Sequence, residues 1–184
     1  CREPYTQIQD AIARSDNSMG IKNKVVEPSM ASGAETAKSL GDGAFLEAVE
    51  IIGNAGTVEC YGTGGSYSVA LDAQHKFLKI GKKCFAHGDA DLQAMSASLL
   101  GPGDAAVGIS HSGGNKAVLD ALALAKSGGA RIIALTNYGR YPITGLSDVV
   151  LFTASRETAF KSDDMESRIA ELVILDALWA AVAF

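Results

Sequence analysis

A short polar stretch near the middle of the chain has residue types that could bind an anion. It runs from Ser110 to Asn115 and reads Ser-His-Ser-Gly-Gly-Asn. It offers two hydroxyls, a side-chain amide and several backbone N–H groups at the start of an expected helix. That set suits the three acceptor oxygens of a phosphate monoester. The alternative is a serine N-cap on a glycine-containing turn, which needs only one of these hydroxyls.

A second glycine-rich stretch lies at residues 62–66 and reads Gly-Thr-Gly-Gly-Ser. Glycine lets the backbone approach an anion closely, and the helix amino terminus that follows favours negative charge. Gly64 and Ser66 are therefore candidate ligand contacts. Glycine-rich turns after a first strand are also common in α/β domains because they pack tightly. By itself this loop leaves ligand binding and simple packing open.

Two nucleotide-binding patterns do not fit the loop at residues 62–66. A dinucleotide fingerprint needs a third glycine, where this chain has Tyr67. It also needs an acid at the end of the second strand, where the chain has His87, with Asp89 close by. A P-loop needs a Gly-Lys-Ser/Thr ending, which is absent. We therefore expect no bound nucleotide and predict no cofactor.

Two catalytic arrangements do not fit the loop at residues 110–115. Gly108 precedes Ser110, but Ser112 follows it, so the Gly-x-Ser-x-Gly nucleophile elbow is absent. His111 stands between the two serines, and neighbours at an extended-to-helix turn point apart, which argues against a Ser–His dyad. The three histidines are scattered and no Cys/His cluster has metal-ligand spacing, so no metal site is predicted.

The elements that must position these loops alternate between short apolar strands and longer helices. Continuous apolar strands of this kind are typical of a parallel sheet covered on both faces. Helices are expected at residues 35–54, where Gly41 and Gly43 are a point of interruption, and at 66–80, 91–100, 115–127 and 166–182. Strands are expected at residues 57–61, 83–86, 105–109, 131–135 and 149–152.

Five such strands predict an α/β fold with a flavodoxin-like, doubly wound, five-stranded parallel sheet flanked by helices, in the order 2-1-3-4-5. In this order strands one and three are neighbours, and the strand order reverses between them. Loops at their carboxyl ends face one crevice, where open α/β sheets bind ligands. Both polar loops follow these two strands. This coincidence predicts one shared site more strongly than either loop alone.

The composition limits the classes of function. The 184 residues are enough for one domain with a sizeable core, and no apolar run is long enough to span a bilayer. The stretch Cys1–Asp10 is too polar for a secretory signal. A net charge of −5 argues against DNA binding by this segment alone. Three cysteines without paired spacing predict reduced thiols and a cytoplasmic protein.

The two ends of the chain differ in character. Residues 1–34 are polar and irregular in pattern and predict a linker or an ordered N-terminal arm, with one domain over residues 35–184. Because the first residue is Cys and not Met, we expect the chain to begin inside a longer gene product. The last helix is apolar over a broad surface, so we expect it to be buried against the sheet or against a second subunit.

Several motifs together resemble the sugar isomerase (SIS) domain family. They are the two loops with the helix starts that follow them, the segment Ala123–Thr136, the Leu-Ser-Asp at residues 146–148, and the stretch from Ser167 to Leu178. The last is similar, more narrowly, to the C-terminal domain of RpiR-type transcriptional regulators. The resemblance runs from about Ala34 to the end of the chain. It implies a flavodoxin-like fold, a bound phosphosugar, and dimers or tetramers.

The resemblance also implies a set of phosphosugar contacts by motif position. They are Ser110, Ser112 and Asn115 around the phosphate, the loop backbone at His111 and Gly113, and Gly64 and Ser66 of the first loop. The chain departs from the family pattern at Gly114 and Asn115, where many members have a larger polar residue followed by Thr. Asn can still donate a hydrogen bond, so the expected phosphate site stands and the sugar preference stays open. The helix-turn-helix of such regulators is not in this chain.

The same motifs occur in enzymes and in sensors, so the residues that could act as a catalytic base decide between the two functions. Isomerases of this family use a positioned base, usually a Glu. Glu157 and Glu166 follow the fifth strand, with Lys161 between them. Glu157 could instead lie in a solvated loop or bind sugar hydroxyls, and Glu166 could place a favourable charge at a helix amino terminus. No Glu–His or Glu–Lys pair stands out.

Three functions therefore remain. They are the phosphosugar-sensing domain of a regulator, a sugar-phosphate isomerase or related enzyme, and a dimerisation module with a degenerate pocket. The match over Ser167–Asp176 favours the sensor.

Overall fold

The computed structural model describes residues 12–13, 15–155 and 165–184, and in them helices and strands alternate after two initial helices. The strands are β1 (Val58–Tyr61), β2 (Cys84–His87), β3 (Ala105–Ile109), β4 (Arg131–Asn137) and β5 (Val149–Thr153). The helices are α1 (Ser18–Ser39), α2 (Asp42–Asn54), α3 (Gly65–Lys79), α4 (Ala90–Ala97), α5 (Lys116–Ser127), α6 (Pro142–Leu146) and α7 (Met165–Ala183).

The five strands form one parallel sheet in the order β2-β1-β3-β4-β5. This confirms the predicted α/β fold and strand order. All five predicted strands are present, with ends that differ from the predicted ones by at most two residues. The short helix α6, between β4 and β5, was not predicted from the sequence.

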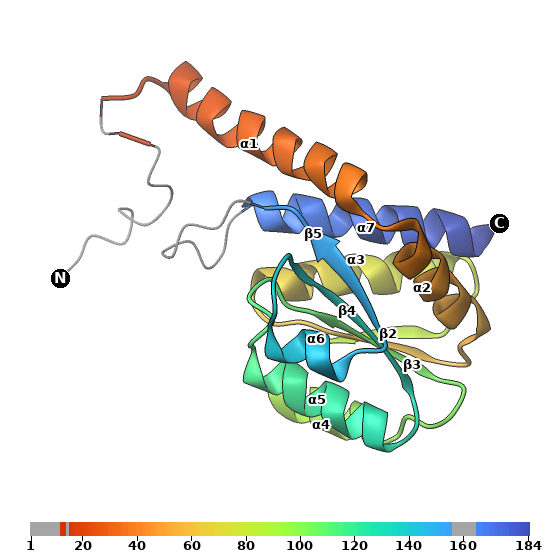
Figure 1. The fold of residues 1–184 in the computed structure, drawn as a ribbon. Helices are drawn as coiled ribbons and strands as arrows, with labels where there is room; N and C mark the ends of the chain where they lie inside the picture. The colour runs from red at the N-terminus through yellow and green to blue at the C-terminus, as the bar shows by residue number, and fades with distance from the viewer. Residues whose placement is uncertain (1–11, 14, 156–164) are drawn as a thin grey trace.

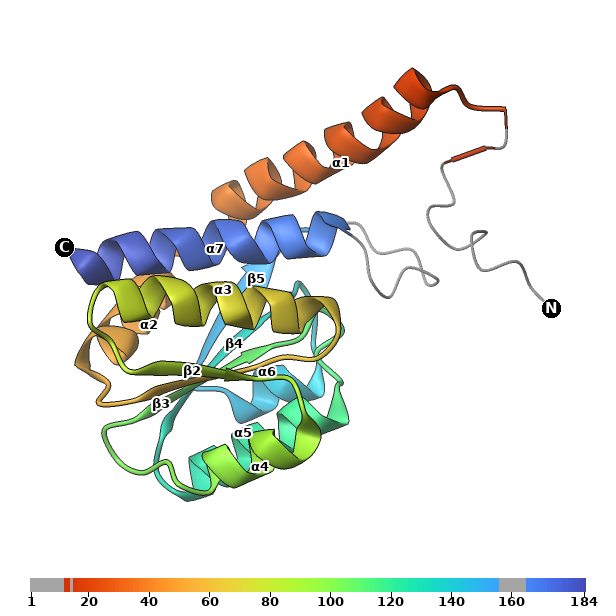
Figure 2. The same cartoon turned by 180° about the vertical axis from the view of Figure 1, so that it is seen from behind.

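Helices cover both faces of the sheet, as Figures 1 and 2 show. On one face α2, α3 and α7 enclose the larger apolar cluster, which includes Ile52, Phe77 and Ile174. On the other face α4, α5 and α6 enclose a second cluster, which includes Leu122 and Ile143. Burying the sheet on both faces explains why its strands read as continuous apolar runs.

Helix α1 was not expected from the hydrophobic pattern. The segment that we described as irregular is helical from Ser18, and α1 runs across the predicted boundary at residue 34. It packs along α7 through small and polar side chains: Ser29, Ser32 and Thr36 are buried. Gly33 faces α7, because a Cβ there would be in van der Waals contact with Val173 Cγ2 at 3.5 Å. Small residues thus bring the two helices close without an apolar stripe that a periodicity search would find.

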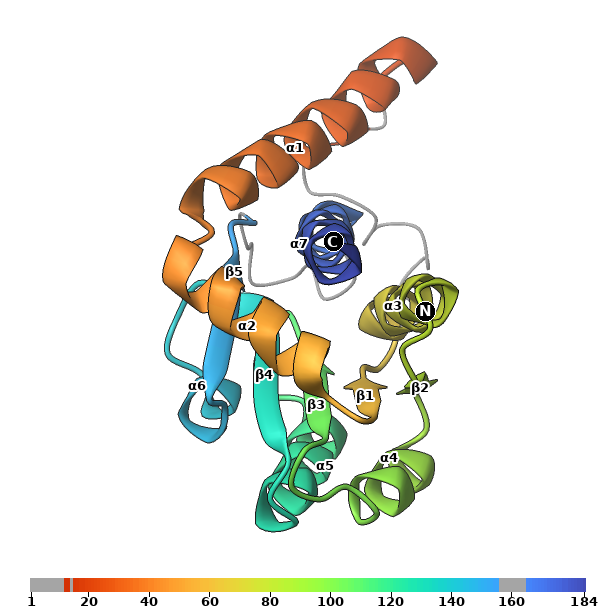
Figure 3. The ribbon, with the colours of Figure 1, turned by 90° about the vertical axis from the view of Figure 1, so that its right-hand side faces the viewer.

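The predicted helix over residues 35–54 is in fact two helices. Helix α1 ends at Ser39, Leu40 and Gly41 are extended, and α2 begins at Asp42. The interruption falls at Gly41, as expected, whereas Gly43 lies within α2. Figure 3 shows the turn between the two helix axes, with the amino-terminal part of α1 extending past the body of the domain.

Helix α7 is buried against the sheet on one side. Ile174, Leu175 and Leu178 belong to the larger cluster, and Trp179 packs against it. The free thiols of Cys60 and Cys84 are also buried in this cluster, 3.8 Å apart, which agrees with the predicted reduced state of these two residues. No helix in the described part of the chain has the length and apolar character needed to cross a membrane.

Candidate functional site

The two polar loops lie side by side. The first joins β1 to α3 and the second joins β3 to α5, and β1 and β3 are paired neighbours. A hydrogen bond connects the loops directly: Asn115 Nδ2 donates to Thr63 Oγ1 at 2.8 Å. The structure therefore brings the loops together at the carboxyl edge of the sheet, as the strand order predicted.

The amide of Asn115 also caps α5. Asn115 Oδ1 accepts from the Val118 N–H at 3.2 Å, which satisfies one of the free donors at the helix start. The serine cap that we held open as the alternative is therefore not what this loop forms. The hydroxyls of Ser110 and Ser112 are left out of the cap. Ser110 is buried and Ser112 is exposed.

The backbone of the second loop is held from several sides. The Ser110 N–H donates to the Leu135 carbonyl at 3.0 Å, and the Ser110 carbonyl accepts from the Gly113 N–H at 3.0 Å. Gly113 has φ of 60°, and a Cβ there would lie 2.5 Å from Tyr141 Cβ. Only glycine fits both the left-handed backbone and the close approach of Tyr141. The loop is thus preformed by β4 and by the segment before α6.

The imidazole of His111 lies against the end of β5. Its Nδ1 is 3.4 Å from Ser155 Oγ, and its carbonyl accepts from the Asn137 N–H at 3.2 Å. The His111 backbone therefore lies between the second loop and the ends of β4 and β5.

The first loop makes a sharp turn into α3. A Cβ on Gly62 would lie 2.6 Å from the Ser66 carbonyl oxygen, so the turn is too tight for any other residue. Gly64 is the N-cap of α3, with φ of 56° and no side-chain cap. The amino-terminal N–H groups of α3 therefore have no capping side chain. Ser66 stands in the first turn, and its Oγ lies 3.4 Å from Glu171 Oε1.

The residues weighed for a dinucleotide site have other roles. The Asp89 carboxylate caps α4 by accepting from the N–H groups of Asp91 at 3.1 Å and Leu92 at 3.0 Å. The ring of Tyr67 closes over Gly88, where an added Cβ would lie 2.6 Å from Tyr67 Cγ. Asp89 is thus a helix cap and not the ribose-binding acid of a dinucleotide site.

Glu171 is the residue at this site that sequence reasoning missed. It lies in the middle of α7 and is 1% exposed. Burial raises the pKa of its carboxyl to about 8, although the hydrogen bond with Ser66 and the charge of Arg168 both act to lower it. The signal in the sequence was an acid within the otherwise apolar run from Ile169 to Leu175.

The structure describes one of the two acids considered as a catalytic base. Glu157 lies outside the described residues, as does Lys161. Glu166 is in the first turn of α7, as its position predicted, but it is buried. Its carbonyl accepts from Ser32 Oγ at 3.2 Å, which ties α1 to the start of α7.

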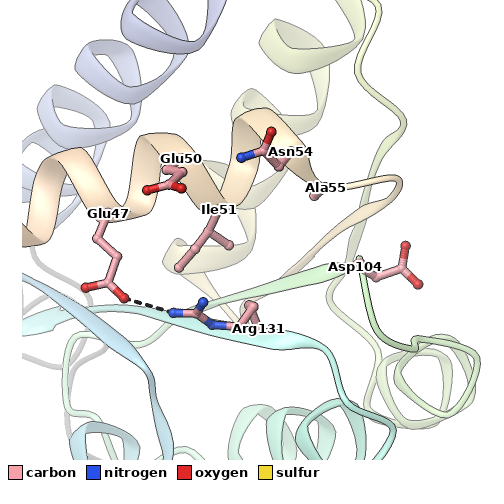
Figure 4. A pocket seen from close by; sticks show the side chains of 8 residues that line it. Glu47, Glu50, Ile51, Asn54, Ala55, Asp104 and Arg131 are labelled. Atoms are coloured by element: carbon pink, nitrogen blue, oxygen red, sulfur yellow. Dashed lines mark hydrogen bonds and ion pairs between the residues drawn. The ribbon is translucent and has the colours of Figure 1, made fainter.

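A cavity of about 340 Å³ lies at the opposite end of the strands, before β3 and β4 (Figure 4). Its walls carry Glu47, Glu50 and Asp104, together with Arg131. Arg131 is already paired with Glu47 at 2.8 Å, as the dashed line in Figure 4 marks, and lies 3.5 Å from Asp148. The excess of carboxylates makes this cavity unsuited to a phosphate.

Comparison with known proteins identifies the fold family. The family model described as the SIS domain matches residues 51–181. The chain belongs to the SIS domain family. This confirms the resemblance inferred from the two loops and from α7.

Several relatives of this SIS domain are named as bacterial transcriptional regulators. It is 36% identical over 177 residues to an uncharacterized HTH-type transcriptional regulator of Caldanaerobacter subterraneus subsp. tengcongensis, which covers 96% of this chain and 63% of that protein. It is 42% identical over 125 residues to the HTH-type transcriptional regulator RpiR of Escherichia coli K12, which covers 68% of this chain and 42% of that protein. The SIS domain thus spans less than two thirds of both regulators.

Solved structures agree with this placement. The Vibrio vulnificus NanR protein complexed with ManNAc-6P superimposes with a TM-score of 0.84 at 29% identity, over 88% of this chain and 61% of that one. The sugar isomerase domain of an RpiR transcription factor from Sphaerobacter thermophilus superimposes with a TM-score of 0.80 over 89% of each chain, and at 23% identity it supports the fold alone. The SIS domain is therefore homologous to domains of RpiR-type regulators.

Proposed function

We propose that this SIS domain binds a sugar phosphate as a signal, as the effector-sensing part of an RpiR-type transcriptional regulator. The two relatives described above are named as transcriptional regulators, and the NanR structure was determined with a phosphosugar. The net charge of −5 fits a segment that senses a ligand while another segment binds DNA. Reduced, buried Cys60 and Cys84 fit a cytoplasmic location.

The observation that carries this proposal is that the second loop caps α5 with Asn115 and not with either serine. Asn115 alone caps α5 and also ties the loop to Thr63. Ser110 and Ser112 are thus two hydroxyl donors at a helix start that the fold does not need for capping. Hydroxyls and N–H groups at a helix amino terminus are the donors that a phosphate monoester requires.

Each predicted contact then has a distinct role. The hydroxyls of Ser110 and Ser112 donate to the phosphate, and the loop backbone near His111 and Gly113 lies around it. The first loop supplies the uncapped start of α3 at Gly64 and the hydroxyl of Ser66. Asn115 mainly holds the two loops in register, because both ends of its amide are already bonded. Glu157 stays a candidate for binding sugar hydroxyls.

The proposal is tested by thermal melting with a panel of ligands. The panel contains ManNAc-6P, glucosamine 6-phosphate, arabinose 5-phosphate, fructose 6-phosphate, the unphosphorylated sugars and inorganic phosphate. A ligand that binds only the native state stabilises it by about 2.7 kcal/mol at a hundredfold excess over its Kd. We expect phosphorylated members alone to raise the Tm, by roughly 5–10 °C, with one or two exceeding free phosphate. Equal shifts from sugars and their phosphates would contradict the proposal.

We also propose that the domain self-associates. Helix α1 extends past the body of the domain in Figure 3, and Met19, Val26 and Met30 on it are exposed. Exposed apolar side chains along one helix commonly mark a contact with another protein. A second copy of this chain is the partner that the family resemblance implies.

A further inference from the structure

The strongest unexplained feature of the site is the buried carboxyl of Glu171. Its Oε1 lies 3.4 Å from Ser66 Oγ in the first turn of α3, and its Oε2 has no hydrogen-bond partner among the described residues. The side chain is 1% exposed, so the carboxyl is shielded from bulk solvent. A buried carboxylate without such partners is costly, whereas a neutral carboxylic acid is tolerated.

The surroundings of Glu171 contain one opposing charge. Arg168, one turn earlier on α7, favours the ionised carboxylate. Among the described residues, Ser66 on α3 is the other group that acts on this carboxyl, through a hydrogen bond that also favours the ionised form. Burial outweighs Arg168 and raises the pKa of Glu171 to about 8, so near neutral pH the group is mainly protonated.

The protonation state of Glu171 determines what Ser66 can do, because a hydroxyl has only one hydrogen to donate. A carboxylate at position 171 can only accept, so Ser66 must donate to it and has no hydrogen left for a ligand. In the bond as it stands Ser66 Oγ donates to Glu171 Oε1, and a protonated Glu171 can reverse it by donating its own hydrogen to Ser66 Oγ. The hydroxyl hydrogen of Ser66 is then free for a phosphate or sugar oxygen.

We propose that Glu171 is a positioning residue that holds a proton, orients the Ser66 hydroxyl toward the phosphosugar, and makes its binding depend on that proton. This inference rests on the proposed function and adds the requirement that Glu171 be protonated when the phosphosugar binds. Loss of the proton from Glu171 weakens binding in two ways. It withdraws the Ser66 donor, and it places a negative charge close to an anionic ligand.

The test is the pH profile of binding by wild type and by Glu171→Gln. Isothermal titration with ManNAc-6P, arabinose 5-phosphate and fructose 6-phosphate is run at pH 7.0, 8.0 and 9.0. These ligands have no amine, and a phosphate monoester with its second pKa near 6 stays a dianion over this range. An unperturbed His, with a pKa near 6.5, stays largely neutral as well.

For wild type we expect the affinity of the phosphosugar that binds to fall about five- to tenfold from pH 7 to pH 9. Glu171→Gln has nearly the same shape, never ionises, and can donate from its amide to Ser66 Oγ at every pH. Its affinity should stay within about twofold over the same range. Ser66→Ala should bind more weakly at pH 7 and lose most of the pH dependence.

Glu59→Gln is the matched control, since Glu59 is another buried acid with a raised pKa but lies on β1 and is not among the proposed contacts. It should keep the wild-type profile. A wild-type affinity that stays constant to pH 9, or an unchanged slope in Glu171→Gln or Ser66→Ala, would overturn this proposal while leaving phosphosugar binding intact. No binding of any of the three phosphosugars at pH 7 would overturn the proposed function itself, and this inference with it.

Discussion

Asn115 and Thr63 join the two loops of the site through a hydrogen bond of 2.8 Å between Nδ2 and Oγ1, and they come from segments 52 residues apart in the sequence. The same amide caps α5 through Oδ1. One side chain therefore sets the start of a helix and its distance from the neighbouring loop. The consequences of changing it can be separated from those of changing the proposed ligand contacts.

The first prediction separates the two roles of Asn115. Thr63→Val removes only the contact between the loops and should lower the free energy of unfolding by about 0.5–1.5 kcal/mol. Asn115→Ala also removes the cap and should cost about 1 kcal/mol more. Asn115→Ser keeps a capping oxygen and should resemble Thr63→Val. Urea denaturation measures all three, and an unchanged stability of Thr63→Val would show that the loops do not depend on this bond.

The second prediction concerns the two serines of the second loop. Ser110→Ala removes one donor to a charged acceptor, worth about 1.5–3 kcal/mol, and should weaken phosphosugar binding tenfold or more. Ser112→Ala should act in the same direction. Neither serine caps α5, so the Tm without ligand should hardly change. Ser127→Ala, at the far end of α5, is the control and should bind as wild type does.

The experiment is the ligand-induced shift in Tm for each variant. If Ser110→Ala and Ser112→Ala both keep the full shift, the hydroxyls are not ligand contacts and the site assignment fails. A large loss of Tm without ligand in either variant would instead indicate a structural role.

The third prediction is a pH dependence of stability that arises from Glu59. This acid lies on β1 and is 6% exposed, with Oε2 3.0 Å from His87 Nε2. Burial raises the pKa of Glu59 to about 7 and lowers the pKa of His87. Although the two groups are close enough for an ion pair, both shifts favour their neutral forms. We therefore treat Glu59 as mainly protonated below about pH 7.

Because the pKa of Glu59 is higher in the folded state than its usual value of 4.5, its contribution to stability is fully present below about pH 4.5. It is lost as the pH rises through about 7. Relative to Glu59→Gln, wild type should lose stability between pH 5 and 7.5, by at most about 1.4 kcal/mol per pH unit. His87 is present in both proteins, so the difference between them reports the Glu59 carboxyl together with its contact to His87. Parallel urea-denaturation curves across this range would contradict the assignment.

The fourth prediction concerns self-association. Sedimentation at micromolar concentration should show a dimer or larger species. Val26→Glu and Met30→Glu place charges on the exposed side of α1 and should shift the protein toward monomer. Leu99, 84% exposed near the end of α4 on the other side of the sheet, is the control position. Dissociation by Leu99→Glu with no effect of the α1 variants would place the interface elsewhere, and a monomeric wild type would exclude self-association.

The fifth prediction is that the domain does not isomerise sugar phosphates. The structure pairs Glu59 with His87, which the sequence did not reveal, but neither residue is among the proposed ligand contacts. The buried acid at the site, Glu171, has a pKa of about 8 and is mainly protonated at pH 7. A protonated carboxyl cannot act as a base. Incubation with glucosamine 6-phosphate, arabinose 5-phosphate or fructose 6-phosphate should give no product beyond buffer controls. Turnover of any one of them in excess over the protein would replace the sensor with an isomerase.

The sequence by itself determined the sheet and the place of the site. Apolar strand runs and helical periodicity are local patterns, and the loops at residues 62–66 and 110–115 follow strands whose pairing is set by general rules of topology. The strand order β2-β1-β3-β4-β5 and the meeting of the two loops could therefore be predicted. The family followed from the same loops and from the motif in α7.

The tertiary structure alone decided which groups the loops use and which acid faces them. Helix α1 packs against the distant helix α7 through small and polar residues such as Ser29, Ser32 and Gly33, so it has no apolar stripe. Ser66 and Glu171 are 105 residues apart, and only the docking of α7 on α3 brings them together. The raised pKa of Glu171 comes from burial, which depends on every element packed around it. Periodicity reports which face of one element is apolar, and it contains no information on which partner covers a polar residue.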